Sequence, residues 1–353
     1  MTRIYLVRHA EAEGNLYRIV QGQGNSNLTD RGWRQVKALS ERFADIHVDE
    51  VYTSDLYRTC ATASAVYKPK GLTPHRRTDL REIYVGSWEG RTWGDIARLW
   101  PEEMKYFSHR PDLWHIEHAE EPMDVLARIE QAVTAIAAEN EDKTVAVFSH
   151  GYAIRLLLAK LQGYPAQRMG ESPTGQNTAV SLLEWEDGAL RIVFRDDTSH
   201  LQTEKYLVGE KVRRKADPLE PGLWFKAPEG GEAESIAQSC GCSLQPGGHT
   251  LIGWSRETAV GLIQLGEECG WIALACIHPD HRAKGFGGQL IGQAVQWTRS
   301  QGGTALYAAL EEGSRAENFF RDYGFVPQEE TKNGKRIFTK DIAFIPEYLS
   351  DTV

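Results

Sequence analysis

Arg8 and His9 are the first residues whose types and spacing could do chemistry. They directly follow the apolar run at residues 4–7, which has the length of a short buried strand, so both side chains fall at a strand end. Arg58 and His150 follow two further predicted strands. Because ligands of open α/β sheets bind beyond the carboxyl ends of the strands, we expect these four side chains to meet at one edge of a sheet.

The charge of this set indicates what it would bind. Two guanidinium groups and two imidazoles would repel one another unless an anion occupied the space between them. Arginine forks match phosphoryl oxygens bidentately, and imidazoles donate further hydrogen bonds, so a dianionic phosphoryl group suits the set. Taken singly, a strand-end histidine is more often structural and a lone arginine is more often a surface ion-pair partner. The prediction of a phosphoryl site therefore depends on the four residues together.

The elements that must position these residues alternate along the first 204 positions. We expect strands at 4–7, 48–54 and 143–149, helices at 28–43, 56–67, 93–121, 123–139 and 152–161, and a hairpin over 178–194. The helix near residue 30 has a plausible N-cap in Thr29 or Asp30. Strand–helix alternation of this kind predicts a parallel sheet covered on both faces.

A second domain follows a break in this rhythm. Residues 208–231 carry three prolines and several glycines, which places the boundary near 205–222. Beyond it we expect a helix at 232–239, short strands, a glycine-rich turn at 282–288, a long helix, a strand at 305–310 and a helix ending at 323. This pattern is typical of an α+β domain and does not repeat the first part.

Composition and charge exclude several classes of protein. The 353 residues are 41% hydrophobic and 25% charged, as in a globular protein of two ordinary domains, and no apolar run is long enough to span a bilayer. The net charge is −9 and neither half is basic, so we expect no nucleic-acid partner, and the basic cluster at 211–215 is predicted to be a solvated linker. Residue 1 leads straight into a strand without a secretory signal, which predicts a cytoplasmic protein with no membrane partner.

The five cysteines are odd in number and scattered, which argues for reduced thiols rather than a disulfide framework. Cys240 and Cys242 could form half of a metal site. Because no His or Cys pair follows them at ligand spacing, we predict no metal there.

Four motifs in the first part resemble the histidine phosphatase (phosphoglycerate mutase-like) superfamily. They are RHAE at 8–11 with Asn15, SDLYRTCATA at 54–63, LREIYVGSWEG at 80–90 and SHG at 149–151. Their order and spacing match the family over about residues 1–204. The resemblance implies a three-layer α/β/α fold and hydrolysis of a small-molecule phosphomonoester, with neither metal nor cofactor.

The same resemblance implies roles for six residues. His9 would take the phosphoryl group as a phosphohistidine, and Glu82 would protonate the leaving oxygen and later deprotonate the attacking water. The residues implied to bind the phosphoryl oxygens are Arg8, Arg58, His150 and Asn15. Elementary electrostatics agrees, because cations beside the His9 imidazole would lower its pKa and keep it neutral and nucleophilic.

Two residues depart from the family pattern near the nucleophile. Ala10 replaces the usual glycine, which is tolerable if φ there stays negative. Ala12 replaces a common threonine and so removes one polar contact to the phosphoryl group. Neither substitution touches the six residues with implied roles.

Three functions stay open for this part of the chain. Phosphatases and mutases of the family share the core residues, and the sequence after Glu82 resembles phosphatase members, with no extra basic cluster for a second phosphate before His150. A module that only binds a phospho-ligand is the third interpretation, although binding alone would not need the acid Glu82. Phosphomonoester hydrolysis is therefore the prediction, with mutase-type phosphoryl transfer as the alternative.

Residues 84–118 are rich in aromatic side chains. Trp88, Trp93, Trp100, Phe107 and Trp114 could form a lid or wall for the substrate, and core packing explains them equally well. The three histidines in the same region are expected at the surface; they are His109, His115 and His118.

The turn at 282–288 resembles the pyrophosphate loop of the GCN5-related N-acetyltransferase (GNAT) family. It follows a strand at 271–277 that ends near HPDHR, and a later helix closes on YGF at 323–325. The resemblance covers about residues 225–345, leaving 205–224 as a linker, and implies binding of acetyl-CoA. Backbone amides at a helix start would hold the pyrophosphate. The loop residues are Arg282, Ala283, Lys284, Gly285, Phe286, Gly287 and Gly288.

Catalysis in this second part is open. Many GNAT members place a tyrosine four residues before the closing glycine, where it protonates the departing thiolate, and this chain has Phe320 there. Tyr323 lies on a different face of the helix. The alternatives are acetyl transfer to an unknown amine acceptor by another group, or acyl-CoA binding without catalysis.

Overall fold

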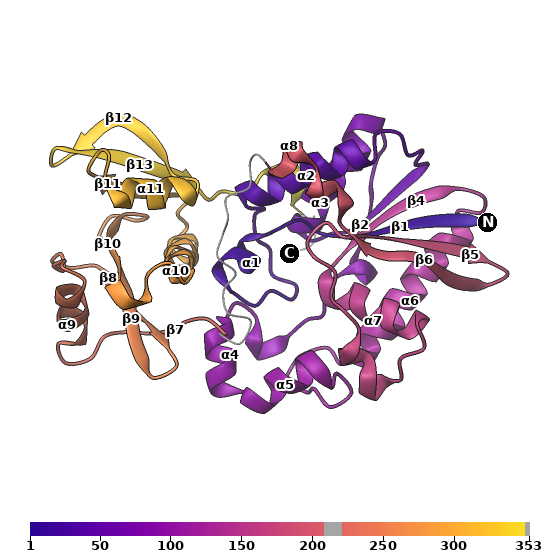
Figure 1. Cartoon of the computed structure of the whole chain (residues 1–353), viewed down its shortest axis with the longest axis horizontal. Helices are drawn as coiled ribbons and strands as arrows, with labels where there is room; N and C mark the ends of the chain where they lie inside the picture. The colour runs from indigo at the N-terminus through magenta and orange to yellow at the C-terminus, as the bar shows by residue number, and fades with distance from the viewer. Residues whose placement is uncertain (208–220, 350–353) are drawn as a thin grey trace.

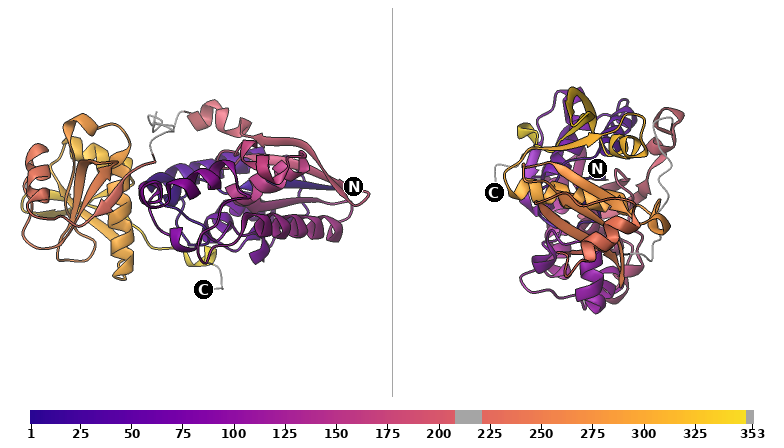
Figure 2. Two further views of the ribbon diagram at one scale, coloured as in Figure 1. Left: turned by 90° about the horizontal axis from the view of Figure 1, so that it is seen from below. Right: turned by 90° about the vertical axis from the view of Figure 1, so that its left-hand side faces the viewer.

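The computed structural model of the protein describes residues 1–207 and 221–349. Two domains lie side by side along the longest axis (Figure 1), and the left-hand view of Figure 2 shows the same separation. The basic cluster predicted to be a solvated linker, residues 211–215, lies outside the described residues.

The first domain is built on a six-stranded sheet in the order β3-β2-β4-β1-β5-β6. Its strands are β1 (Thr2–Arg8), β2 (Glu50–Ser54), β3 (His75–Arg77), β4 (Thr144–Ser149), β5 (Val180–Glu186) and β6 (Ala189–Asp197). The first four strands run parallel, but β5 is antiparallel to both β1 and β6. The prediction of a parallel sheet is therefore wrong for the last two strands, because the expected hairpin joins the sheet and a short turn can connect only antiparallel neighbours.

Helices cover both faces of this sheet. The α-helices of the domain are α1 (Glu13–Tyr17), α2 (Asp30–Arg42), α3 (Tyr57–Lys70), α4 (Trp93–Leu99), α5 (Pro101–His109), α6 (Pro122–Glu139), α7 (Gly151–Leu161) and α8 (Glu204–Leu207). Ile4 and Leu6 of β1 share one core with α6 and α7, whereas Val7 shares another with α2 and α3. The three-layer α/β/α arrangement is confirmed, and its central strand β4 is buried on both faces, as its apolar run predicts.

Local sequence signals account for the start of α2 and for the break between α4 and α5. Thr29 caps α2, because its hydroxyl accepts a hydrogen bond from the Gly32 backbone N–H at 3.0 Å, and this confirms one of the two predicted caps. The expected helix at 93–121 is shorter than predicted and divides into α4 and α5. The break comes at Trp100, directly before Pro101, where a residue is biased away from helical geometry.

The second domain contains two antiparallel sheets. One has the order β10-β9-β8-β7 and the other the order β11-β13-β12. Its elements are β7 (Trp224–Lys226), α9 (Glu232–Ser239), β8 (His249–Ser255), β9 (Thr258–Leu265), β10 (Ile272–Ile277), α10 (Phe286–Ser300), β11 (Ala305–Leu310), α11 (Arg315–Asp322), β12 (Val326–Lys332) and β13 (Lys335–Asp341). A parallel bridge between Trp271 and Tyr307 connects the two sheets just before β10, and the α+β class is confirmed.

The chain crosses between the domains outside the predicted linker. Tyr17 and Ile19 belong to the first domain, but they are buried in the hydrophobic core that α10 forms with the strands of the second domain. In return, the C-terminal segment runs back to the first domain, where Tyr348 is buried against α3 and α2 (Figure 2). The domains thus share core residues at two places.

Candidate active site

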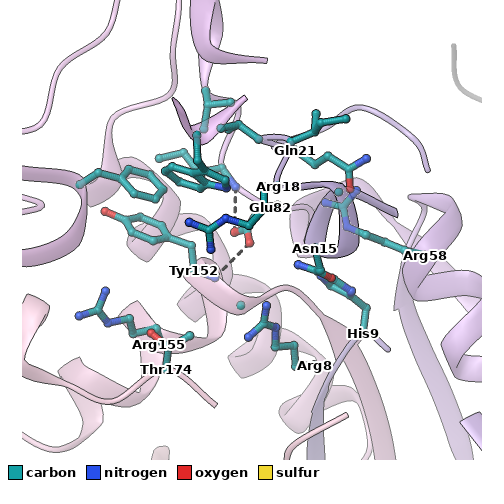
Figure 3. Close-up of a pocket in the computed structure, with 18 of the residues that line it drawn as sticks. Arg8, His9, Asn15, Arg18, Gln21, Arg58, Glu82, Tyr152, Arg155 and Thr174 are labelled. Carbon is teal, nitrogen blue, oxygen red and sulfur yellow. Dashed lines mark hydrogen bonds between the residues drawn. The ribbon is translucent and has the colours of Figure 1, made fainter. Parts of the chain in front are cut away.

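A cavity of about 350 Å³ opens at the carboxyl ends of the parallel strands of the first domain (Figure 3). Five of the six residues singled out in the sequence line it: Arg8, His9, Asn15, Arg58 and Glu82. The sixth, His150, is fully buried, and its ring lies beside the ring of His9 with centroids 5.4 Å apart. The structure therefore brings together all six residues from five separate segments of the chain.

His9 is held in one tautomer by its own backbone neighbour. Its Nδ1 lies 2.8 Å from the carbonyl oxygen of Ala10, and because a carbonyl can only accept, Nδ1 carries the proton and donates it. The lone pair is then on Nε2. Burial lowers the pKa of His9 well below its usual value, and the guanidinium groups of Arg58 and Arg8 lower it further, so the ring is neutral.

Like His9, His150 is buried and lies near positively charged side chains. Its Nε2 pairs with the Ser54 hydroxyl at 2.9 Å, and no described residue hydrogen-bonds to its Nδ1. Burial lowers the pKa of His150 well below its usual value, and the neighbouring Arg58 and His9 lower it further. A buried nitrogen without a partner is costly, so this atom is suited to bind a ligand oxygen.

The two arginines are fixed by backbone carbonyls. Arg58 is 1% exposed and donates from Nη1 to Gly24 at 2.9 Å and from Nη2 to Gly22 at 2.7 Å. Arg8 donates from Nη1 to Gly175 at 2.5 Å, and its Nε has no partner among the described residues. Carbonyl bonds orient a guanidinium without neutralising its charge, so both cations stay available to an anion.

Glycine is required next to Arg8. A Cβ at Gly151 would come within 2.9 Å of the Arg8 Nε, so any larger residue would push the guanidinium aside. This explains the glycine of the SHG motif. Ala10 meets the condition set for it in the sequence, because it does not have a positive φ.

Glu82 lies at the start of α7. Its Oε2 accepts a hydrogen bond from the Tyr152 backbone N–H at 3.0 Å, and its Oε1 accepts one from Ala153 at 3.0 Å. Oε1 also accepts from the Ile83 backbone N–H at 3.1 Å. The first N–H groups of a helix have no intrahelical acceptor and attract negative charge, so this helix end holds the carboxylate at the cavity wall.

Asn177 and Thr178 were missed in the sequence. The Asn177 side chain donates to the carbonyl oxygen of His9 at 3.0 Å and to Asn15 Oδ1 at 3.3 Å. Thr178 has φ of +60°, a conformation that β-branched residues rarely adopt, and its backbone N–H donates to the same His9 carbonyl at 3.3 Å. No short-range sequence signal relates residues 177–178 to His9, because the antiparallel pairing of β5 with β1 brings them together.

Aromatic side chains also line the cavity. Trp93, Phe107 and Tyr152 line it, and the last two rings stack with centroids 4.3 Å apart. Trp88 and Trp114 are at most 1% exposed and belong to the core. Core packing therefore accounts for Trp88 and Trp114, whereas Trp93 and Phe107 lie at the cavity wall, and their contact with a substrate stays a prediction. The three histidines predicted at the surface are exposed.

Two further arginines line the cavity, Arg18 and Arg155 (Figure 3). Arg155 donates to the carbonyl oxygens of Ser172, at 2.9 Å, and Ser108, at 3.1 Å. Among the described residues that line the cavity, Glu82 is the only acidic one. The lining therefore carries four guanidinium groups against one carboxylate, which favours an anionic ligand.

The loop before α10 has the geometry expected of an anion site. Ala283 has φ of +61° and Gly285 has φ of +83°, and the chain then turns directly into the helix at Phe286. The N–H groups of the first turn of α10 have no intrahelical acceptor. Phe320 is 5% exposed and packs edge-on against Phe325 inside the core, so its position offers neither a proton nor access to a thiolate.

No helix in residues 1–207 and 221–349 has the length and apolar character that a membrane span requires. Within the same ranges, no cluster of three or more His, Cys, Asp or Glu side chains is arranged to hold a metal ion.

Fold and site together define a phosphoglycerate mutase-like domain that carries a histidine between two arginines. The sequence model of the histidine phosphatase superfamily (branch 1) matches residues 4–198, and that of the acetyltransferase (GNAT) family matches residues 216–325. The chain therefore belongs to the histidine phosphatase superfamily and continues into a GNAT domain. Both family resemblances seen in the sequence are confirmed.

Named relatives cover the first domain. Phosphoserine phosphatase 1 of Hydrogenobacter thermophilus is 27% identical over 201 residues, which are 57% of this chain and 95% of that protein. A probable phosphoglycerate mutase GpmB of Erwinia tasmaniensis is 30% identical over 207 residues, which are 57% of this chain and 96% of that protein. The solved structure of Bacillus stearothermophilus YhfR has a TM-score of 0.55 at 30% identity and covers 57% of this chain and all of that one.

Proposed function

We propose that the first domain hydrolyses phosphomonoesters through a phosphohistidine on His9. The observation that carries this proposal is the tautomer of His9: its Nδ1 proton is committed to the Ala10 carbonyl, and a neutral Nε2 lone pair remains beside two arginines. A neutral, dry imidazole next to fixed cations is what nucleophilic attack on a phosphoryl dianion requires.

The reaction balances with the residues present. Nε2 of His9 attacks phosphorus, the bond from phosphorus to the alcohol oxygen breaks, and protonated Glu82 gives its proton to that oxygen. Glu82 then removes a proton from water, the hydroxide attacks phosphorus, and the phosphorus–nitrogen bond breaks to release inorganic phosphate. Arg8, Arg58, Asn15 and the free Nδ1 of His150 bind the phosphoryl oxygens during both transfers.

A mutase would direct the phosphohistidine to a second alcohol instead of water. Relatives of both names match this domain, one a phosphoserine phosphatase and the other a probable phosphoglycerate mutase. A panel of metabolite phosphomonoesters distinguishes hydrolysis from mutase-type transfer. For each ester, the release of inorganic phosphate is measured together with phosphoryl transfer to added alcohols. Hydrolysis requires that phosphate appear in step with loss of the ester.

The test of the nucleophile is a trapped intermediate. Rapid acid-free denaturation during turnover should leave a phosphohistidine that a peptide digest assigns to residue 9. His9→Ala should lower phosphate release by at least about a thousandfold. His109→Ala removes an exposed histidine from the same domain and serves as the matched control, which should keep full turnover. Turnover of His9→Ala at the wild-type rate would overturn the proposal.

For the second domain, we propose acetyl-CoA binding by the loop at 282–288 and N-acetyl transfer to an amine acceptor. The support is the match to the GNAT family together with a left-handed loop that leads into α10. The burial of Phe320 favours a proton donor elsewhere or, as a second candidate, acyl-CoA binding without catalysis.

Calorimetry with acetyl-CoA tests the ligand, and release of free thiol in the presence of amines tests the transfer. Gly285→Glu places a carboxylate and a side chain where φ is +83°, and it should weaken acetyl-CoA binding at least tenfold. Gly313→Glu is the matched control, because Gly313 has a similar φ of +73° and lies outside the loop. Absence of measurable heat with the wild type would reject the ligand.

A further inference from the structure

Helix α1 lies on the side of the first domain that faces the second domain (Figure 1), and it contacts α10. Asn15, in its middle, lines the cavity. Glu13 and Tyr17, at its ends, face α10 of the second domain, with which this five-residue helix is in contact. One short helix therefore carries a phosphoryl-site residue and two contacts with the second domain.

The first of these contacts is a partly buried ion pair, in which the Glu13 carboxylate is the buried partner. Arg299 of α10 donates to Glu13 from Nη1 at 2.7 Å and from Nη2 at 3.1 Å. Glu13 is 6% exposed, and its Oε2 also accepts the Asn27 backbone N–H at 3.1 Å. Because a buried carboxylate that loses its partner is costly, α1 would have to shift if Arg299 were removed.

The second contact is steric. A Cβ built on Gly292 of α10 would lie 2.5 Å from the Cβ of Tyr17, so the two helices touch backbone to side chain. Arg18 comes next, in the left-handed region at φ of +59°, and Ile19 returns to the core of the second domain. Arg18 lines the cavity, and its Nη2 donates to the carbonyl oxygen of Pro221 at 2.9 Å.

We propose that Arg299, a residue of the GNAT domain, is a positioning residue for phosphoryl transfer. Through Glu13 it holds α1, and α1 holds Asn15 and Arg18 at the mouth of the phosphoryl site. The inference depends on the proposed phosphatase function, and it makes the second domain a structural part of the phosphatase site. It also gives the fusion a physical reason, because the phosphatase domain alone would lack the contact that fixes α1.

The test compares three variants of the full chain. Arg299→Ala should raise both the KM for a phosphomonoester and the dissociation constant of inorganic phosphate, roughly three- to tenfold, because loose Asn15 and Arg18 lose hydrogen bonds to the anion. Arg299→Lys, which keeps the charge, should restore part of the loss. Arg321→Ala is the matched control, because Arg321 pairs at 2.7 Å with a buried glutamate, Glu317, inside the second domain and should leave both constants unchanged.

A purely structural role for Arg299 would lower thermal stability and leave the phosphate affinity alone. Gly292→Ala provides an independent readout, because alanine favours the helix yet pushes Tyr17 away. It should weaken phosphate binding while α10 remains folded. In Glu13→Gln combined with Arg299→Ala, the loss of affinity should be smaller than the sum of the single losses.

The outcomes separate this inference from the proposed function. Wild-type phosphate affinity in both Arg299→Ala and Gly292→Ala would overturn the inference. If the wild type bound phosphate but hydrolysed no ester, the proposed hydrolysis would fail, and the phosphate affinities of the variants would still decide the role of Arg299. Failure of the wild type to bind phosphate would overturn both.

Discussion

The imidazole rings of His9 and His150 lie with centroids 5.4 Å apart and planes inclined by 57°. Both rings are buried, at 5% and 0% exposure, and both are close to Arg58. Two neighbouring imidazoles beside a fixed cation cannot both be protonated without strong repulsion. Both rings are therefore neutral at physiological pH. His9 provides a nucleophilic nitrogen and His150 provides a hydrogen-bonding ring at the same cavity.

The acid limb of the activity profile should lie at unusually low pH. Burial and then the charge of Arg58 lower the pKa of His9 well below 6.5, so the neutral nucleophile persists as the pH falls through that value. We expect kcat/KM to show no loss with a midpoint near 6.5. NMR titration of the His9 ring should show the neutral form at pH 5.5, and a protonated ring at that pH would contradict the site electrostatics.

Glu82→Gln should separate binding from turnover. Glutamine keeps the size of the side chain and one oxygen that can accept from the first turn of α7, but it has no acidic proton for the leaving oxygen. We expect kcat to fall by about a hundred- to ten-thousandfold for an alkyl phosphate, with the phosphate dissociation constant changed far less. The deficit should shrink for an aryl phosphate, whose leaving oxygen needs less protonation, and an equal deficit for both esters would contradict the assignment.

His200 should make folding stability depend on pH. Arg42 lies 3.3 Å from its Nδ1 and the Thr178 hydroxyl 3.0 Å from its Nε2, and burial, then Arg42, lowers the pKa of His200 to about 4. The unfolded chain binds this proton below about pH 6.5 and the folded chain does not until pH 4. The stabilisation is thus complete above pH 6.5 and is lost as the pH falls toward 4.

The contribution of His200 to the free energy of unfolding that is lost between pH 6.5 and 4 is on the order of 3 kcal/mol. Urea unfolding at several pH values measures it, with His200→Gln as the comparison. Between pH 6.5 and 4, the free energy of unfolding should change less steeply with pH in the variant. The difference in slope should correspond to the uptake of about one proton on unfolding. Equal slopes in the two proteins would show that His200 does not carry this linkage.

The sequence predicted what depends on short-range pattern. Apolar runs predicted the central strands, and the hydroxyl of Thr29 predicted the start of α2. The positions of residues after parallel strands predicted four of the six side chains that meet at the cavity, whereas Asn15 and Glu82 were implied only by the family resemblance. Each of these signals lies within a few residues of the feature it predicts, so periodicity and capping rules were sufficient to find it.

Features that depend on long-range contact were not predictable in this way. Asn177 reaches the backbone of His9 because two strands pair antiparallel, and Arg299 reaches Glu13 across 286 residues. Trp88 and Trp93 are separated by five positions and have different roles, one in the core and one at the cavity wall. Which face of a short helix points inward is decided by its neighbours and not by its own sequence.

The C-terminal segment should stabilise the first domain although it follows the second. Tyr348 is 4% exposed, with its ring centroid 5.8 Å from that of Tyr57 and 6.0 Å from that of Trp33. Arg76 also donates to the carbonyl oxygens of Glu347, at 2.8 Å, and Leu349, at 2.7 Å. Because Tyr57 directly precedes Arg58, this contact supports the start of the helix that carries an arginine of the cavity.

Tyr348→Ala would leave a cavity against two aromatic rings and should lower the free energy of unfolding of the first domain by about 3 kcal/mol. The temperature at which phosphatase activity is lost should fall, whereas acetyl-CoA binding by the second domain should stay unchanged. Val326→Ala is the matched control, because it truncates a side chain of the second domain that is 55% exposed. If the two variants lost phosphatase activity at the same temperature, the C-terminal segment would not belong to the fold of the first domain.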